Sequence, residues 1–297
     1  GYAPQFMRNT LQLNRGMDKD SLPSFSETGQ LAGVDATDWS WSALWADLDN
    51  DGWRDLIVTN GYPRDVTNRD FINYNAQALM KGYADERFNK HTMAALRELD
   101  GAFLHNFVFQ NRGDLTFEDQ SANWGFTRKA YSTGAAYADL DNDGDLDIII
   151  SNTYSPASIY RNNAGSKTQN HYLKIGLSGP PGNIQGYGTK LKLFAGGLSL
   201  YHEHFPARGY QSTVDATVHF GLGKQTGIDS LNVIWPDGKT QTLHAVGADQ
   251  VLQLHYANST VSPAHMASPG TTAIFRPANA AYNIHYRHTE TPYTDFN

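Results

Sequence analysis

The chain has 297 residues, contains no cysteine and carries a formal net charge of −7. Without cysteine it cannot form a disulfide scaffold, a Cys-ligated zinc site or an iron–sulfur cluster, and its negative charge disfavours unaided binding to nucleic acid. No apolar run reaches the roughly 18–20 residues that a membrane-spanning helix needs.

A repeat occupies the first part of the chain. The tripeptide Asn-Arg-Gly at residues 14–16 recurs at 111–113, and the heptapeptide Ala-Asp-Leu-Asp-Asn-Asp-Gly at 46–52 recurs at 138–144. A third copy begins at residues 160–165 and stops there. The repeat therefore includes two matched acidic loops.

β-Strands are predicted on both sides of each acidic loop. The residues that follow the loops, 55–59 and 147–151, are β-branched or aliphatic, as in a buried strand. The residues that precede the loops, 42–46 and 134–138, are small and aromatic. Each loop should join two consecutive strands, and we predict an all-β repeat region over residues 1–166.

Residues 63–106 differ from the β pattern around them. Leu79, Met80 and Tyr83 recur at helical spacing, and a second short apolar face follows at residues 93–99. We predict a small helical insertion into the repeat region.

The composition changes after about residue 167. Short β runs alternate with Gly and Pro turns, and Trp-Pro-Asp-Gly at residues 235–238 is typical of a hairpin turn. We predict a separate all-β domain at residues 167–257. Residues 258–297 are rich in Ser, Pro, Ala and Thr, and we expect a linker or a C-terminal extension there.

Both acidic loops spell D-x-D-x-D-G-x-x-D, and together they hold nine of the 30 acidic side chains. Like charges at this density repel one another unless a cation is bound between them. Aspartates at positions 1, 3 and 5 converge on one point, the glycine at position 6 permits the turn, and position 7 offers its backbone carbonyl. The predicted ligands are Asp47, Asp49, Asp51, Trp53 and Asp55 in the first loop and Asp139, Asp141, Asp143, Asp145 and Asp147 in the second.

Calcium is the cation that suits this set of ligands, because it takes about 6–8 oxygen atoms in a flexible arrangement. We predict two calcium ions, with an exposed acidic turn that binds no metal as the alternative. An EF-hand is disfavoured, since position 12 of neither loop is Glu and the flanking residues favour strands over helices.

Aromatic and histidine residues supply the other candidates. Trp39, Trp41 and Trp53 could form a platform for sugar rings, with packing between strands as the alternative. His202 and His204 would share one face of a strand, but the sequence places no further metal ligands beside them. Neither H-E-x-x-H nor G-x-S-x-G occurs, so no catalytic residue is nominated.

The acidic loops resemble those of the FG-GAP/VCBS repeat family, whose repeats form blades of a β-propeller. Within the second domain, Gly-Tyr-Gly-Thr (186–189), Gly-Tyr-Gln-Ser (209–212), His-Phe-Gly-Leu-Gly (219–223) and Val-Ile-Trp-Pro-Asp-Gly (233–238) resemble the ASPIC/UnbV domain. This domain order is similar to that of Bacteroidetes cell-surface VCBS proteins and of the cartilage acidic protein group in animals.

The resemblance implies propeller blades with bound calcium, followed by a β-sandwich-like domain. A closed propeller has roughly 4–8 blades, whereas this chain holds two and a fraction. The resemblance therefore implies packing against further blades of a longer chain.

The function that we predict is a calcium-binding, non-catalytic module for adhesion or for capture of a glycan or protein ligand, secreted or on the outer cell surface. The alternative is a calcium-dependent carbohydrate-active enzyme, a polysaccharide lyase or hydrolase, or a fragment of one. Nucleic-acid binding is disfavoured by the negative charge.

Overall fold

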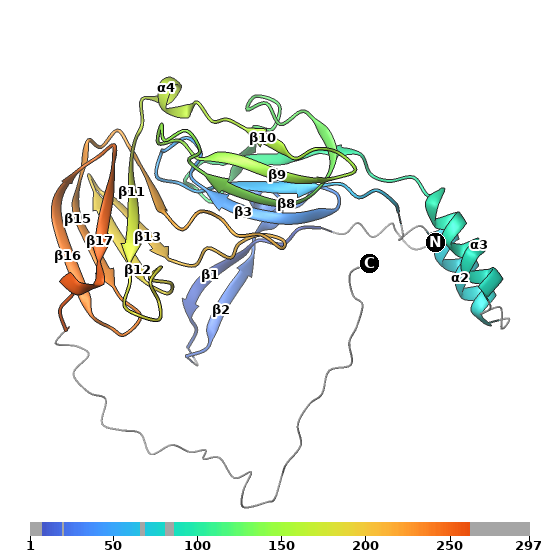
Figure 1. Cartoon of the computed structure of the whole chain (residues 1–297), viewed down its shortest axis with the longest axis horizontal. Coiled ribbons are helices and arrows are strands. Elements are labelled where there is room, and N and C mark those ends of the chain that lie inside the picture. Colours follow the sequence, from blue (N-terminus) through green and yellow to red (C-terminus); the bar gives the residue numbers. More distant parts are fainter. Residues whose placement is uncertain (1–7, 20, 66–68, 81–85, 262–297) are drawn as a thin grey trace, which may run out of the picture.

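A computed structural model describes residues 8–19, 21–65, 69–80 and 86–261. Antiparallel sheets dominate it, and the helices are few and short (Figure 1). Among the described residues, no helix combines the length and the apolar character needed to cross a membrane. The predicted extension at residues 258–297 lies almost wholly outside the described part of the chain.

The first acidic loop connects two adjacent strands of a four-stranded antiparallel sheet, which we call the first blade. All six residues of β4 are buried, which explains the run of aliphatic side chains after the loop. Ala46 pairs with Asp55, so the loop closes directly onto the ends of both strands. In sheet order the strands are β3 (Ser40–Ala46), β4 (Asp55–Asn60), β6 (Phe107–Asn111) and β7 (Phe117–Asp119).

A second sheet, the second blade, repeats this arrangement around the second acidic loop. Ala138 pairs with Asp147 in the same register as Ala46 with Asp55. Strands β3 and β8 lie side by side, and Leu44, Ile57 and Ile150 belong to one core between the two sheets. In sheet order the strands are β10 (Ser158–Tyr160), β9 (Asp147–Thr153), β8 (Lys129–Ala138) and β5 (Leu104–His105).

The N-terminal hairpin matches only the outer half of a blade. It consists of β1 (Gln12–Met17) and β2 (Pro23–Glu27), followed by the short helix α1 (Gly29–Ala32). Its Asn-Arg-Gly corresponds to the one at the end of β6. Within the part of the chain that the structure describes, these two strands pair only with each other. No closed propeller is formed by the described residues.

The helical insertion is confirmed. Helices α2 (Arg69–Met80) and α3 (Glu86–Arg97) project away from the sheets (Figure 1). A bridge between Tyr62 and Ala102 closes the base of the insertion. Tyr83, which we expected on the first helix, lies outside the described residues.

Two sheets of the second all-β unit pack face to face as a sandwich. Leu173 and Ile175 of one sheet and Leu191 and Leu193 of the other are fully buried in a common core with Trp235. Helix α4 (Ala164–Thr168) leads into the sandwich and the 3-10 helix η1 (Tyr256–Asn258) follows it. One sheet has the order β14 (Val218–Gly223), β11 (His171–Ser178) and β17 (Gln250–His255); the other has β13 (Leu198–Glu203), β12 (Lys190–Ala195), β15 (Gly227–Ile234) and β16 (Thr240–Gly247).

These sheets confirm the predicted fold class, which is mainly β with blade-like repeats, a small helical insertion and a sandwich. Local patterns suffice for this because the residue types along strands such as β4 and β12 match their burial. Strand β12, for example, alternates exposed and buried residues from Lys190 to Ala195.

Candidate metal centres

The backbone of both acidic loops turns at the same two positions. Asn50 and Gly52 have φ of 58° and 96°, and their equivalents Asn142 and Gly144 have 62° and 93°. This left-handed region is accessible to Gly and, at lower cost than for other residues, to Asn. The two loops therefore coil in the same way for the same steric reason.

Position 1 of each loop organises the turn. The Asp47 carboxylate accepts hydrogen bonds from the amides of Asp51 (3.1 Å) and Gly52 (2.9 Å). Asp139 accepts the equivalent bonds from Asp143 (3.2 Å) and Gly144 (3.0 Å). Since carboxylate–amide bonds of this kind are directional, they hold the coil with its side chains facing inward.

Three carboxylates converge inside each coil. In the first loop, one carboxylate oxygen from each of Asp47, Asp49 and Asp55 lies within 4.8 Å of the other two. In the second loop, the oxygens of Asp139, Asp141 and Asp147 lie within the same distance of one another. A single cation can therefore be reached by all three carboxylates in either loop.

The remaining predicted ligands are placed less directly. Asp51 accepts a bond from the Trp53 amide (2.7 Å) and Asp143 one from the Asp145 amide (3.0 Å), so each has one oxygen engaged within its loop. The Asp145 side chain is bonded outside its loop, to Gly165 and Asn50. Coordination by these residues, including the carbonyls at position 7, stays a prediction.

The aspartates of the first loop are buried to a degree that leaves their negative charges poorly solvated. Burial, followed by the charges of the neighbouring aspartates, raises the pKa of Asp47 well above its ordinary value. Burial also raises the pKa of Asp51 to about 6 and that of Asp55 to about 8. These shifts express the cost of ionising several buried carboxylates together without a cation.

Asp49 carries the observation that fits a metal most directly. Its Oδ2 accepts a bond from Gln110 Nε2 (2.7 Å), whereas its Oδ1 is buried and has no hydrogen-bond partner. A buried carboxylate oxygen without a partner is costly, and a cation in the loop would supply one. The donor set consists only of oxygen atoms, which suits calcium rather than zinc.

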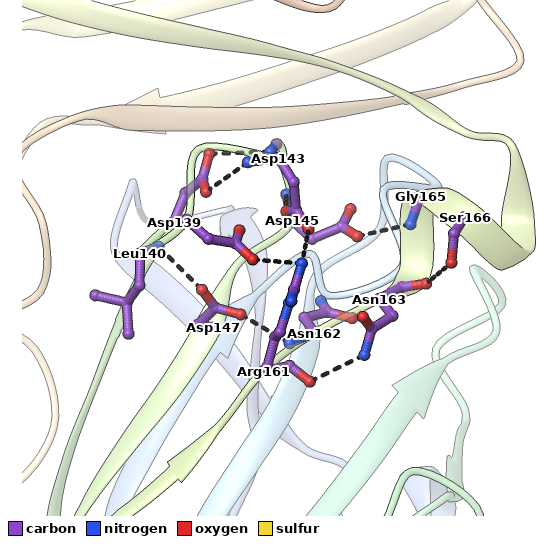
Figure 2. Close-up of polar contacts among 12 residues, drawn as sticks. Asp139, Leu140, Asp143, Asp145, Asp147, Arg161, Asn162, Asn163, Gly165 and Ser166 are labelled. Carbon is purple, nitrogen blue, oxygen red and sulfur yellow. Dashed lines mark hydrogen bonds and ion pairs between the residues drawn. The ribbon is translucent and has the colours of Figure 1, made fainter.

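Two cations that the sequence did not nominate lie against the second loop. Lys174 Nζ on β11 is 2.6 Å from Asp139 Oδ2, and both side chains are nearly fully buried. The Arg161 guanidinium is 2.7 Å from Asp141 Oδ2, and Figure 2 shows Arg161 directed into the acidic loop. The second loop therefore carries counter-charges of its own, which distinguishes the two centres electrostatically.

Lys174→Met tests this distinction. We expect calcium affinity at the second loop to rise about tenfold, because a competing positive charge beside Asp139 is removed, in line with roughly 1.4 kcal/mol per factor of ten. Isothermal titration calorimetry with calcium measures this affinity. Lys190→Met, at an exposed position of β12, is the matched control, and an unchanged affinity in Lys174→Met would show that the lysine does not compete.

The pH dependence of the calcium-free protein follows from the raised pKa of Asp55. A carboxyl whose folded-state pKa is raised binds more protons when folded, so its stabilising contribution is lost as pH rises through the folded-state pKa of about 8. We expect the melting temperature in chelator to fall as pH rises from about 5 to about 8, and calcium to reduce that fall. A melting temperature that rises over this interval in chelator would contradict the expectation.

Asn50 joins both loops to the sandwich. Its Nδ2 donates to Asp145 Oδ1 (2.9 Å), its Oδ1 accepts a bond from His219 Nε2 (2.6 Å), and its carbonyl accepts one from the Gly223 amide (2.8 Å). Burial lowers the pKa of His219 to about 4, so the imidazole is neutral at physiological pH. His219 lies in β14 and contacts the first loop through this bond.

Gly221 allows β14 to lie directly against the first loop. A Cβ at this position would lie 2.1 Å from Asp47 Oδ2 and 2.6 Å from the Asn50 backbone. At the second loop the Tyr172 ring fills the corresponding space, 1.9 Å from where a Cβ on Gly144 would be. The His-Phe-Gly-Leu-Gly segment thus forms the contact surface of the sandwich for a candidate metal centre.

The three candidate tryptophans do not form one surface. Trp39 comes just before β3 and Trp41 is its second residue, at the end remote from the loop. At about 3.3 Å per residue, they lie roughly 15–25 Å from the loop. Trp41 packs on Tyr210 with ring centroids 4.9 Å apart. Trp53 lies on the loop itself and is 47% exposed.

His202 lies in β13 and His204 just after it, and neither belongs to a metal-ligand cluster among the described residues. His202 Nδ1 lies 3.0 Å from an Arg54 guanidinium nitrogen. Burial, followed by the charge of Arg54, lowers the pKa of His202 to about 3. A second cation beside Arg54 would be repelled.

Comparison with known proteins identifies both regions. The FG-GAP-like repeat family matches residues 98–150, and the family described as ASPIC and UnbV matches residues 179–261. Cartilage acidic protein 1 of Homo sapiens is 27% identical over 177 residues, which cover 54% of this chain and 25% of that protein. The Xenopus tropicalis protein of the same name is 33% identical over 139 residues, which cover 42% of this chain and 20% of that protein.

The chain thus spans at most about a quarter of the length of these curated relatives. Both matched families and this relative confirm the resemblance drawn from the acidic loops and the glycine-rich segments of the sandwich. Parts of the chain thus match an FG-GAP-like repeat and an ASPIC and UnbV domain, and the chain is similar to cartilage acidic protein 1.

Proposed function

We propose that this chain is an extracytoplasmic, calcium-binding module that captures a glycan or protein ligand for adhesion and catalyses no reaction. The observation that carries the proposal is the convergence of three carboxylates within 4.8 Å in each of two loops. Both loops lie where the blades meet the sandwich, so metal binding and domain arrangement depend on the same residues.

Calcium, when bound, supplies positive charge and oxygen coordination to the loops. The first ion would be held by Asp47, Asp49, Asp51, Asp55 and the carbonyl of Trp53, and the second by Asp139, Asp141, Asp143, Asp147 and the carbonyl of Asp145. The chain's own residues fix the geometry around the ion. Asp55 fixes the strand ends by accepting bonds from the amides of Leu48 (3.0 Å) and Asn111 (2.9 Å).

An extracytoplasmic location is supported by the FG-GAP-like repeat and by relatives whose name refers to cartilage. Calcium outside cells reaches concentrations that fill sites of millimolar to micromolar affinity, so loops of moderate affinity would be occupied there. Secretion and exposure on the outer cell surface are both compatible with the domain combination.

The domain division forms part of the same proposal, with the repeat region at 1–166, the ASPIC/UnbV domain at 167–257 and an extension at 258–297. The half-blade formed by β1 and β2 supports packing against further blades, since its pairing is limited to one hairpin within the described chain. An unpaired strand edge is a ready partner for another strand.

The test combines three measurements on the same preparation. Calcium titration by calorimetry should show two binding events, and a glycan and protein panel should yield binding that chelator abolishes. A reducing-sugar assay on the bound polysaccharides should stay flat. Calcium binding at neither loop would overturn the metal assignment, and turnover of a bound polysaccharide would overturn the non-catalytic assignment.

A further inference from the structure

A cleft of about 650 Å³ opens between the two blades beside the first candidate metal centre. Its lining includes Gln110 of β6, residues 123–126, Ile148, Tyr160 and Asp49. This volume lies within the roughly 300–1,000 Å³ of small-molecule sites. The lining comes from both blades and from the segments next to them.

The apolar part of the cleft is aromatic. Phe126 and Tyr160 stack with centroids 4.2 Å apart and planes 14° apart. Trp124 is half-buried and packs against the core between the blades, so its ring is held in place while part of it lines the cleft. A rigid aromatic surface of this kind suits the C–H face of a pyranose ring.

The polar part of the cleft favours hydroxyl groups and a negative charge. Asn123 and Asn163 are exposed and offer amides, and the cations Arg161 and Lys167 line the same space. Asp49 is the single acid among the residues that line the cleft, and it is a candidate metal ligand. Arg161 is already paired with Asp141 and Asp143, so Lys167 is the cation of the cleft lining that is left to pair with an anion.

We propose that this cleft binds an acidic saccharide, with a pyranose ring stacked on Trp124 and its carboxylate paired with Lys167. The inference rests on the proposed function, because it names the ligand class that the module captures. Trp124 was not among the candidates from the sequence; a single Trp after a short strand carries no local signal that separates a binding platform from core packing.

The lining of the cleft connects this site to the metal loops. Asn162 Nδ2 donates to the carbonyls of Leu48 (2.7 Å) and Leu146 (3.3 Å), one from each loop. Thr168 and Asn170 bond the Asp49 carbonyl from the segment that leads into the sandwich. Disordering either loop would break hydrogen bonds to Asn162 and Thr168, which line the cleft, so saccharide binding should require calcium.

The experiment measures binding of a glucuronate-containing disaccharide and of its neutral methyl ester by calorimetry, at one fixed free calcium concentration and in chelator. We expect the acid to bind at least tenfold more tightly than the ester and to lose binding in chelator. Trp124→Ala should abolish binding of both ligands. Lys167→Gln should lower the affinity for the acid several-fold and leave the affinity for the ester unchanged. Lys167 is exposed, so its variant will fold.

Tyr154→Ala is the control, because Tyr154 is an exposed aromatic residue outside the cleft and outside both acidic loops and should retain full binding. Equal binding of acid and ester, or wild-type binding by Lys167→Gln, would overturn the ligand class. A dimer in solution that Trp124→Ala dissociates would assign the cleft to a second copy of the chain. Calcium binding without any saccharide binding would overturn this inference alone and leave the calcium assignment standing.

Discussion

Asp49→Asn should abolish calcium binding at the first loop and leave the second loop intact. The substitution keeps the size of the side chain and an oxygen for the bond from Gln110, but it removes the charge of the carboxylate whose Oδ1 is buried without a partner. A site filled at 100 times its dissociation constant stabilises a fold by about 2.7 kcal/mol. The calcium-induced rise in melting temperature should therefore fall by several degrees.

Calorimetry should find one calcium ion bound to this variant where the wild type binds two. Asp114→Asn is the control, since Asp114 is an exposed aspartate that caps the turn between β6 and β7 and lies outside both loops. Two ions bound to Asp49→Asn with wild-type affinity would remove Asp49 from the metal centre. Asp139 is less suitable for this test, because removing it also leaves the buried Lys174 without its partner.

Gly221→Ala should destabilise the protein by several kcal/mol and separate the first loop from the sandwich. The new methyl group would lie 2.1 Å from Asp47 Oδ2 and 2.6 Å from the backbone of Asn50, so loop or strand must move. Overpacking of this kind costs typically about 1–3 kcal/mol, and loss of the Asn50–His219 bond adds to it.

The measurement is chemical denaturation with and without calcium, together with calcium titration of the variant. We expect a weaker first site, because Asp47 is the carboxylate that the methyl group displaces. Gly247→Ala is the matched control at another strand residue, where a Cβ would meet only Gln250 Nε2 at 3.4 Å. Equal stability of Gly221→Ala and Gly247→Ala would show that the sandwich tolerates movement at this contact.

The sandwich packs against the metal loops, and both predictions concern residues next to this contact. Asn50 belongs to the first loop, bonds the second loop through Asp145 and bonds β14 through His219. Calcium binding should therefore stabilise the junction of blades and sandwich as well as the blades themselves. Lys174 adds an ion pair to the same junction at the second loop.

Much of the architecture follows from local sequence. Strands β4 and β9, the turns at Gly52 and Gly144 and the helical insertion were all predictable. Each depends on residues close together in the chain, through runs of aliphatic residues, the steric freedom of glycine and helical periodicity. From the sequence we expected the carboxylates at positions 1, 3 and 5 to converge, whereas the structure brings together those at positions 1, 3 and 9.

The relations between distant segments depended on the tertiary structure. Lys174 is 35 residues from Asp139 and His219 is 169 residues from Asn50, and no local pattern pairs them. Trp39 and Trp53 look like one cluster in the sequence, yet an extended strand moves them to opposite ends of a sheet.

By itself, the sequence determined two aspartate-lined coils, the strands that flank them and the class of the second domain. Only the tertiary structure decided that Lys174 and Arg161 pair with the second loop and that the glycine-rich strand β14 packs on the first. It also decided that Trp124 lines a cleft between the blades. The physical reason is that a coil is set by steric and electrostatic rules within about ten residues, whereas packing of one sheet on another is set by complementary surfaces from remote parts of the chain.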